Sequence, residues 1–313
     1  CDGVVVDRED LDLVEPVPPR TSVMLRCEPK VPPTGRCHLL VTYRLARPDS
    51  LRAAGHVLGF DEIALRNADR RHRWVAALAD RPTGETRLPV RREGTRIEVD
   101  SDRLSCAIDT RTGLPVSLSS EGRELLQRPV ELNIWRAPTD NDRHARLEWE
   151  RAHYHQAVAR AYGVDVDEEP GCVTVSADVG LVAPSVQPAL RGRLVWTLTD
   201  DGVLSLSLRL RRTLGFPSLP RLGLRLFLPE SMSQVDYYGL GPQESYVDKH
   251  RASYHGAFSA DVVDLHEDYI RPQENGSHAD CNKVVLSGGG LSLAAVGPTP
   301  FSFNASRYTQ EEL

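Results

Sequence analysis

Strict alternation of apolar and polar residues over long runs is the feature of this sequence that most limits its fold. From Leu204 to Leu210 every second residue is leucine, with serine or arginine between, and Leu222–Leu228 also has leucine at every second position. Val173–Val179 and Leu194–Leu198 alternate in the same way. A period of two residues places apolar side chains on one face of a strand, whereas a helix would scatter them around a cylinder. The pattern therefore predicts antiparallel strands with one covered face.

Glycine-containing turn sequences separate the alternating runs. Asp200–Gly202 predicts a hairpin between two of them, and Asp109–Gly113 and Ser287–Gly290 predict two more. Many long strands joined by such turns are typical of a large β-sandwich. Ala145–Tyr162 lacks both clear alternation and strong breakers, so it is compatible with either a short helix or an ordered loop.

The first part of the chain has a different pattern, with proline-rich stretches between short apolar runs. Its predicted strands are Thr21–Cys27, Cys37–Leu45 and Gly55–Leu65. These few strands suit a partial immunoglobulin-like sandwich over residues 1–67. Residues 68–94 are polar and predict a linker, and residues 95–313 predict a large antiparallel β-sandwich. We therefore expect an all-β chain with two domains.

Composition excludes several classes of function. The net charge is −6 and the arginines are scattered along the sequence, so we expect no broad basic surface and no nucleic acid partner. No stretch approaches the roughly 18 apolar residues of a membrane span. None of the six cysteines has the spacing of a metal site. Cys27 and Cys37 could pair across a hairpin or could remain reduced and buried, and reduced thiols fit a cytoplasmic protein.

Four polar clusters interrupt the apolar pattern, and the first contains Asp140, Asn141, Asp142 and Arg143. Two carboxylates, an amide and a guanidinium group in one loop could bind sugar hydroxyls through paired hydrogen bonds. Alternatively, the loop satisfies itself: the two aspartates pair with Arg136 and Arg143, and Asn141 caps a turn. Spacing alone leaves both interpretations open.

The other clusters contain two glutamates, Glu244 and Glu274, that could form a glycosidase pair. A retaining glycosidase needs two carboxyl groups about 5–5.5 Å apart. Sequence does not show that these two meet, and each lies beside an amide side chain in a turn, so we predict no catalytic residue. The sequence also lacks the G-x-S-x-G and H-E-x-x-H motifs, and no metal site is predicted.

Together the four clusters resemble motifs of family 2 glycoside hydrolases, the large bacterial β-galactosidases. The family motifs are R-A-P-T-D-N-D-R, G-x-G-P-x-E-x-Y, Y-x-x-P-Q-E-N-G and F-N-x-S-x-Y-T-x-E-E-L. The matching segments are Arg136–Arg143, Tyr238–Tyr246, Tyr269–Gly276 and Phe303–Leu313, in the family order. Residues 1–94 resemble the family more weakly, through phrases such as Glu15–Pro19.

The resemblance implies the C-terminal region of such an enzyme, namely the end of an immunoglobulin-like linker domain and most of a galactose mutarotase-like supersandwich. In that family a (β/α)₈ barrel carries both catalytic glutamates and the magnesium and sodium sites, so the resemblance implies no cofactor in this chain. It also implies that Asp140, Asn141, Asp142 and Arg143 shape the aglycone side of the active site. The implied partners are a β-galactoside substrate, the N-terminal domains and further copies in a homo-oligomer.

Some residues depart from the family pattern, including His144 where the family usually has glycine. The chain starts at Cys1 without methionine and stops at Leu313, before a stacking tryptophan of the family. We therefore expect a non-catalytic fragment of a retaining β-galactosidase, truncated at its C-terminus. One alternative is a separate small subunit of a two-chain β-galactosidase. Another is a mutarotase-like epimerase that uses His266, His278 and Glu274.

Overall fold

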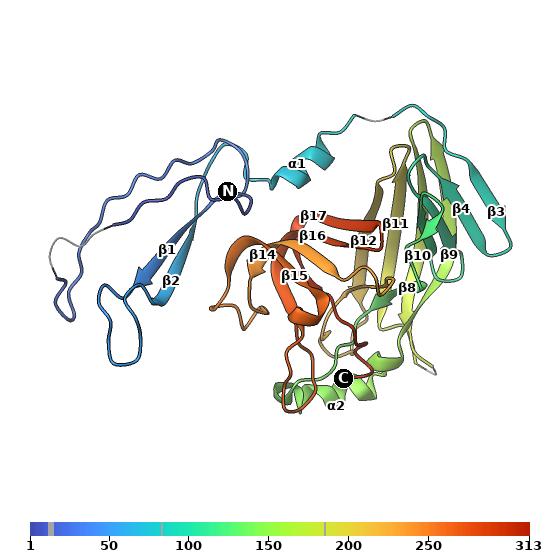
Figure 1. Ribbon diagram of the computed structural model, residues 1–313. Helices are drawn as coiled ribbons and strands as arrows, with labels where there is room; N and C mark the ends of the chain where they lie inside the picture. Colours follow the sequence, from blue (N-terminus) through green and yellow to red (C-terminus); the bar gives the residue numbers. More distant parts are fainter. Residues whose placement is uncertain (12–15, 83, 185) are drawn as a thin grey trace.

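The computed structural model describes residues 1–11, 16–82, 84–184 and 186–313. Glu15 of the N-terminal phrase and residue 83 of the predicted linker lie outside the described residues. Strands make up most of the regular structure, and all pairs of strands among the described residues are antiparallel (Figure 1). The predicted all-β class is therefore confirmed.

The N-terminal part holds one hairpin, formed by β1 (His38–Arg44) and β2 (Val57–Ala64). These are the only strands within residues 1–11 and 16–67. The predicted strand at Thr21–Cys27 is wrong: Met24 is 95% exposed, and no described strand pairs with this segment. The segment has the apolar residues expected of a strand, but a strand also needs a neighbouring strand for its backbone hydrogen bonds. The immunoglobulin-like assignment of residues 1–67 stays a prediction.

Two sheets form the main sandwich. A five-stranded sheet contains β3 (Val90–Glu93), β4 (Arg96–Asp100), β5 (Ser105–Asp109), β6 (Leu114–Ser120) and β7 (Arg123–Glu124). A four-stranded sheet contains β9 (Val158–Glu169), β10 (Cys172–Val182), β11 (Leu190–Thr199) and β12 (Leu204–Arg212). Because β3 pairs with β4, the first sheet begins inside the predicted linker, which also holds the helix α1 (Arg73–Ala79).

The core of the sandwich contains the inward-facing side chains of both sheets, among them Ile108, Leu194 and Trp196. The indole of Trp196 donates a hydrogen bond to the carbonyl of Gly113 on the other sheet at 2.9 Å. Gly113 has φ +72°, and a β-carbon there would lie 2.6 Å from the Ala177 β-carbon. The turn therefore needs glycine both for its left-handed backbone and for its close packing.

A second group of strands completes the chain. β8 (Arg128–Asn133) pairs with β13 (Gly223–Phe227), and a further sheet contains β14 (Gln234–Gly241), β15 (Tyr254–Asp261), β16 (Ser277–Gly288) and β17 (Leu291–Asn304). A smaller core around Tyr237 and Cys281 lies on this sheet, and Leu286 packs against both cores. The three predicted hairpin turns join β5 to β6, β11 to β12 and β16 to β17, as expected.

The undecided segment after residue 144 contains a helix and then a strand. α2 (Ala145–Arg151) and the short 3₁₀ helix η2 (Tyr154–Gln156) precede β9, which starts at Val158. The other 3₁₀ helices are η1 (Asp140–Asp142) and η3 (Val262–Leu265). No helix in the described ranges is long and apolar enough to cross a membrane.

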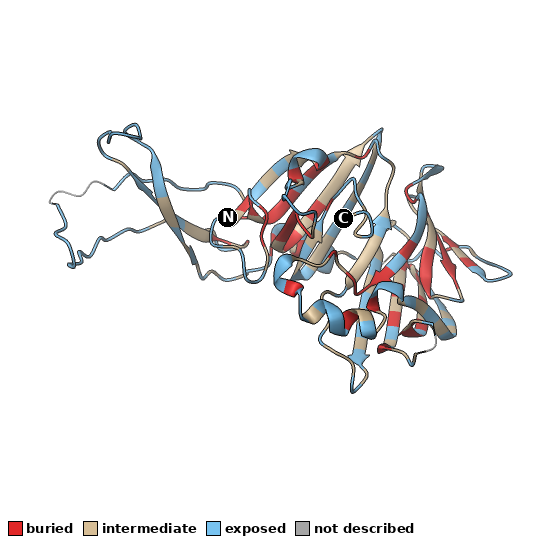
Figure 2. Cartoon of the chain, turned by 90° about the horizontal axis from the view of Figure 1, so that it is seen from below, coloured by how far each residue is buried: buried red, intermediate tan, exposed pale blue. Residues whose placement is uncertain are grey.

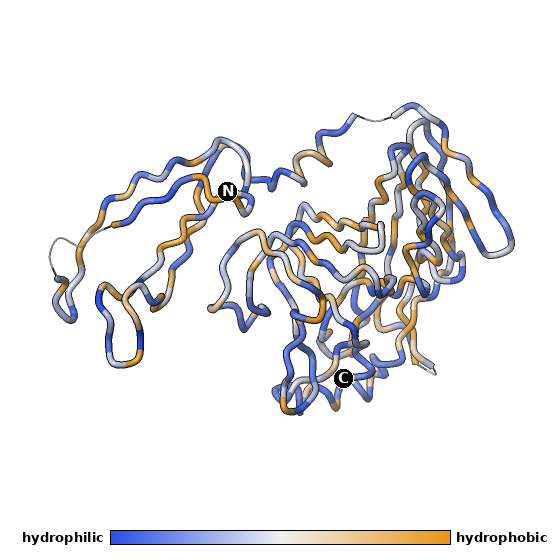
Figure 3. Tube along the Cα trace, in the orientation of Figure 1, coloured by the Kyte–Doolittle hydropathy of each residue, from blue (hydrophilic) through white to orange (hydrophobic). Residues whose placement is uncertain are grey.

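Burial differs sharply between the two parts of the molecule. Figure 2 shows buried residues gathered in the strands of the sandwich, whereas the β1–β2 hairpin is largely exposed or intermediate. Apolar segments run along the hairpin in Figure 3, and Leu40, Tyr43 and Ile63 are 39%, 48% and 52% exposed. Polar groups link the hairpin to the sandwich, for example Arg36, whose Nη2 lies 2.8 Å from Asp280 Oδ2. Hydrogen bonds and charge thus help to hold the hairpin, together with the edge-on packing of Phe60 against Tyr254.

The arginines are less scattered than the sequence predicted. Arg191 and Arg193 on β11 lie directly opposite Arg211 and Arg209 on β12, and all four are exposed. They line a hollow of about 620 Å³ on the outer face of the four-stranded sheet. Sequence order hid this grouping because strand pairing brings the two arginine pairs together.

The six cysteines are all free. Cys37 is buried, as one alternative expected, but Cys27 is exposed. No disulfide therefore supports the N-terminal part.

Candidate functional site

The four polar clusters, which are far apart in the sequence, meet at one end of the molecule. The N–H of Glu274 donates to the carbonyl of Ala137 at 3.2 Å, which joins the third cluster to the first. The N–H of Gly276 donates to Glu244 Oε2 at 2.8 Å, and the Asn304 side chain donates to a backbone carbonyl of the third cluster. In Figure 1, α2 and the C-terminus lie at this same end. We define this group of loops as the motif end.

Asp142 fixes the loop that follows β8. Its two carboxylate oxygens lie 2.7 and 2.9 Å from Arg136 Nη2, and one of them accepts the Thr139 N–H at 2.9 Å. The Asp142 N–H in turn donates to the Thr139 carbonyl at 3.0 Å. Asp142 is buried, so its carboxylate holds the turn together and does not face solvent. For Asp142 the structure thus agrees with the alternative in which the loop satisfies its own polar groups.

The other three predicted residues point outward. Asp140 is exposed and pairs with Arg271 of the third cluster at 3.0 Å, not with Arg143. Asn141 and Arg143 are exposed, and their side chains form no hydrogen bond within the part of the chain that the structure describes. The loop therefore presents one amide and one guanidinium group whose donors are available to a ligand.

A hollow of about 220 Å³ lies beside this loop. Its lining residues are Pro138, Thr139, Asp140, Arg143, Arg146, Leu147, Glu150 and Arg271. Sequence reasoning missed Arg146 and Glu150, which lie on α2 and form an ion pair at 2.6 Å. Their spacing of four residues was the available signal, because such pairs stabilise helices. Arg271 gave no such signal, since only the fold brings it to Asp140.

Glu244 and Glu274 each form an ion pair with a different basic side chain. Glu244 contacts Lys249 and the hydroxyl of Tyr269, and Glu274 contacts Arg221. Burial alone would raise the pKa of Glu244, but the hydrogen bonds from its neighbours outweigh burial and hold that pKa below its usual range. Burial raises the pKa of Glu274 despite the nearby Arg221. Neither carboxyl group lines the hollow, so the motif end offers no free carboxylate pair.

The residues considered for an epimerase also contact other side chains. His278 is 1% exposed, and its Nδ1 lies 3.0 Å from the hydroxyl of Tyr237 in the smaller core. The ring of His266 lies 3.5 Å from Asp268 on the surface. Together with the ion pair of Glu274, these contacts leave no histidine–glutamate pair facing the hollow.

We expect Glu244 to contribute to stability in a pH-dependent way. Its folded-state pKa is lowered, so the stabilisation is fully present above the unfolded-state pKa of about 4.3 and is lost as the pH falls through the folded-state pKa. The difference in unfolding free energy between the wild type and Glu244→Gln should therefore shrink between pH 6 and pH 3. Urea unfolding at several pH values measures it. Glu121→Gln, at an exposed position, is the control, and a constant difference for Glu244→Gln would contradict the prediction.

Comparison with known proteins relates the chain to β-galactosidases. Residues 100–313 match the family model described as Beta galactosidase small chain. The chain is 35% identical to a β-galactosidase of Actinobacillus pleuropneumoniae, over 94% of this chain and 28% of that protein. It is 30% identical to a β-galactosidase of Staphylococcus xylosus, over 88% of this chain and 27% of that protein. The chain thus spans little more than a quarter of the length of these curated relatives.

Proposed function

The chain belongs to the beta galactosidase small chain family, and from this premise we propose that it is the non-catalytic C-terminal part of a retaining β-galactosidase of glycoside hydrolase family 2. Its role is to support and rim the active site of a (β/α)₈ barrel that hydrolyses terminal β-galactosides. Support comes from the family match, from the names of the relatives, and from the convergence of four polar clusters at the motif end.

The observation that carries this proposal is the loop pinned by Asp142. Its buried carboxylate holds the turn through Arg136 and the Thr139 N–H. From this turn Arg143 lines the hollow, and Asn141 is exposed. A support of this kind lowers the entropic cost of binding a sugar. We assign the aglycone side of the substrate to Asp140, Asn141 and Arg143, with Asp142 as the residue that positions them.

The chain's own residues bind and orient, and they do not cleave the glycosidic bond. Retaining hydrolysis needs one carboxyl group as acid and base and a second as nucleophile. Glu244 and Glu274 are held in ion pairs, so we assign both catalytic glutamates to the barrel, together with the magnesium and sodium sites. We also propose a cytoplasmic location and a homo-oligomeric enzyme, and the free cysteines fit the first of these.

The chain alone should not hydrolyse 2-nitrophenyl β-D-galactoside. The assay is release of nitrophenol by the purified 313-residue chain, beside a parallel assay of the longer enzyme. Turnover by the chain that disappears in Glu244→Gln or Glu274→Gln would refute the proposal. Mutarotation of α-D-galactose by the chain would instead favour the epimerase.

The description of the family as a small chain also favours a second arrangement, in which this polypeptide is a separate subunit. Co-purification with a barrel-bearing chain of its own, and activity only in the mixture, distinguishes that arrangement from a single long polypeptide. The role of the motif end is the same in both.

In the enzyme that contains this chain and its barrel, we expect Arg143→Ala to lower kcat/KM for aryl galactosides by about tenfold to hundredfold. Loss of a hydrogen bond that involves a charged group costs about 1.5–3 kcal/mol. Steady-state kinetics measures the change. Arg193→Ala is the control, because Arg193 is also exposed but lies on the outer sheet face. Equal effects of the two substitutions would remove the assignment of Arg143 to the substrate.

A further inference from the structure

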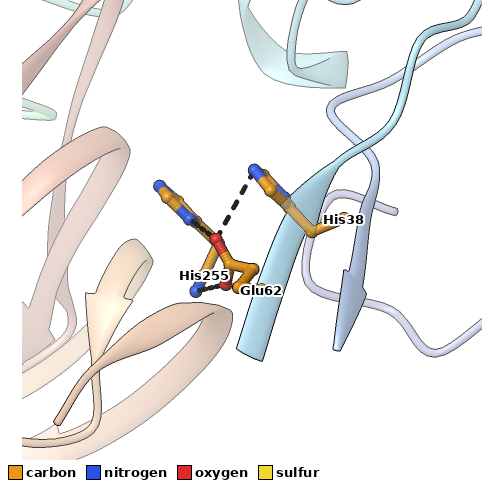
Figure 4. A group of neighbouring side chains, drawn as sticks. All are labelled: His38, Glu62 and His255. Carbon is orange, nitrogen blue, oxygen red and sulfur yellow. Dashed lines mark hydrogen bonds and ion pairs between the residues drawn. The ribbon is translucent and has the colours of Figure 1, made fainter. Parts of the chain in front are cut away.

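Two histidines and a glutamate come together where the β1–β2 hairpin meets the sandwich. His38 lies on β1, Glu62 on β2 and His255 on β15, and one ligand atom of each lies within 4.8 Å of the other two. Figure 4 shows the three side chains pointing toward one another across this boundary. Their side chains are only 11%, 17% and 9% exposed. The boundary therefore contains a shielded group of metal-ligating atoms.

His255 is held in the orientation of a metal ligand. Its Nε2 lies 2.8 Å from Asp280 Oδ2, and its Nδ1 faces Glu62 Oε1. Arg36 Nη2 lies 3.1 Å from the same Nε2, but Arg36 is paired with Asp280 at 2.8 Å, which offsets its charge. Metal-binding histidines commonly donate their second ring nitrogen to a carboxylate in this way. Nδ1 is therefore the atom that can bind an ion, and the ion would replace the present contact of Nδ1 with Glu62 Oε1.

The ion pairs do not account for the position of His38. Its ring is stacked on that of His255, with centroids 4.2 Å apart and an angle of 2° between the planes. Its Nε2 lies 3.9 Å from Glu62 Oε1, and no other polar partner is found among the described residues. The side chain is only 11% exposed, and the part of the protein that the structure describes supplies no hydrogen bond to the ring. A bound ion would give this nitrogen a partner.

We propose that His38 Nε2, Glu62 Oε1 and His255 Nδ1 bind a divalent transition metal ion, with zinc the best match, and that the ion clips the hairpin to the sandwich. Two imidazole nitrogens and a carboxylate oxygen are typical zinc ligands, and a water can complete the tetrahedron. Ligand atoms around zinc lie roughly 3.3 Å apart. To bind the ion, Glu62 Oε1 and His38 Nε2, now 3.9 Å apart, must therefore approach, and Glu62 Oε1 and His255 Nδ1, now in hydrogen-bond contact, must separate. The His38 ring must turn out of its stack, because parallel rings cannot aim two lone pairs at one ion.

Sequence spacing predicted no metal site because the third ligand comes from a strand far along the chain from the β1–β2 hairpin. Glu62 and His255 are 193 residues apart, and only the docking of the hairpin brings them together. The cluster lies in the N-terminal hairpin and on β15, away from the residues that line the hollow of the motif end. The metal site is therefore independent of the proposed role in galactoside hydrolysis.

The experiment titrates zinc chloride into the chelator-treated chain and follows binding by calorimetry. We expect one zinc ion per chain and a rise in the Tm of the hairpin region. His38→Phe keeps a stacking ring but removes both ring nitrogens. It should weaken zinc binding by at least about tenfold, because mutation of a residue that only supports a metal ligand already costs about that much affinity. His56→Phe, in the same hairpin but outside the cluster, should bind zinc like the wild type.

The six thiols are the same in every variant, so the comparison separates the cluster from binding at cysteine. Asp280→Asn provides a second test if His38→Phe does not fold, and it should weaken binding about tenfold to hundredfold. Absence of saturable binding, or equal binding by His38→Phe and the wild type, would overturn the proposal and leave the cluster as an ion-pair lock.

Discussion

Replacement of Asp142 by alanine should lower the unfolding free energy of the sandwich by about 3 kcal/mol. Loss of one partner of a buried ion pair costs roughly 3–5 kcal/mol, because the remaining charge stays buried. The lower value applies here, since the Arg136 side chain keeps 23% exposure. The substitution also removes the acceptor of the Thr139 N–H. Urea unfolding followed by tryptophan fluorescence measures the change.

Asp140→Ala is the matched control for this prediction. Asp140 belongs to the same loop, but its pair with Arg271 is exposed on both sides, at 62% and 71%. Exposed pairs contribute at most about 1 kcal/mol. If both alanine variants lose the same stability, Asp142 does not have the positioning role assigned to it. In the enzyme with its barrel, Asp142→Ala should also lower activity, because Arg143 loses its fixed support.

Replacement of Leu194 by alanine should cost about 2–5 kcal/mol of unfolding free energy. Leu194 lies on β11 with no exposed surface, between the two sheets of the sandwich. Removal of its side chain loses the transfer free energy of the deleted groups and leaves a cavity. Thermal unfolding should show a clearly lower Tm. Leu214→Ala is the control, because that leucine is 93% exposed and its loss should change stability by less than about 0.5 kcal/mol.

The sandwich was predictable because its signal is local. In Leu204–Leu210 the period of two residues alone fixes which side chains face the core, and the structure has β12 there. Glycine in the Asp109–Gly113 turn is likewise a local signal, since the backbone needs a positive φ at its last residue. Such features depend on neighbours in sequence, which a single chain displays directly.

The errors came from features that depend on distant neighbours. Thr21–Cys27 has the residues of a strand but no partner strand, whereas β9 has weak alternation and forms because β10 pairs along its whole length. At the motif end, the presence of a polar loop was predictable from sequence. The contacts of Asp142 with Arg136 and Thr139 are local and agree with one of the two interpretations left open by the sequence. The pairing of Asp140 with Arg271 was not predictable, because only the tertiary fold brings these residues together.

Leu286 packs against both cores and so connects the β14–β17 sheet to the sandwich. We expect the sandwich and the β14–β17 sheet to unfold as one cooperative unit. Their backbone amides should therefore exchange with solvent deuterium at a common slow rate. The β1–β2 hairpin has few buried apolar side chains and can open without disturbing that unit. Amides of β1 and β2 should exchange much sooner than those of β10. An ion bridging Glu62 and His255 would slow exchange in the hairpin alone.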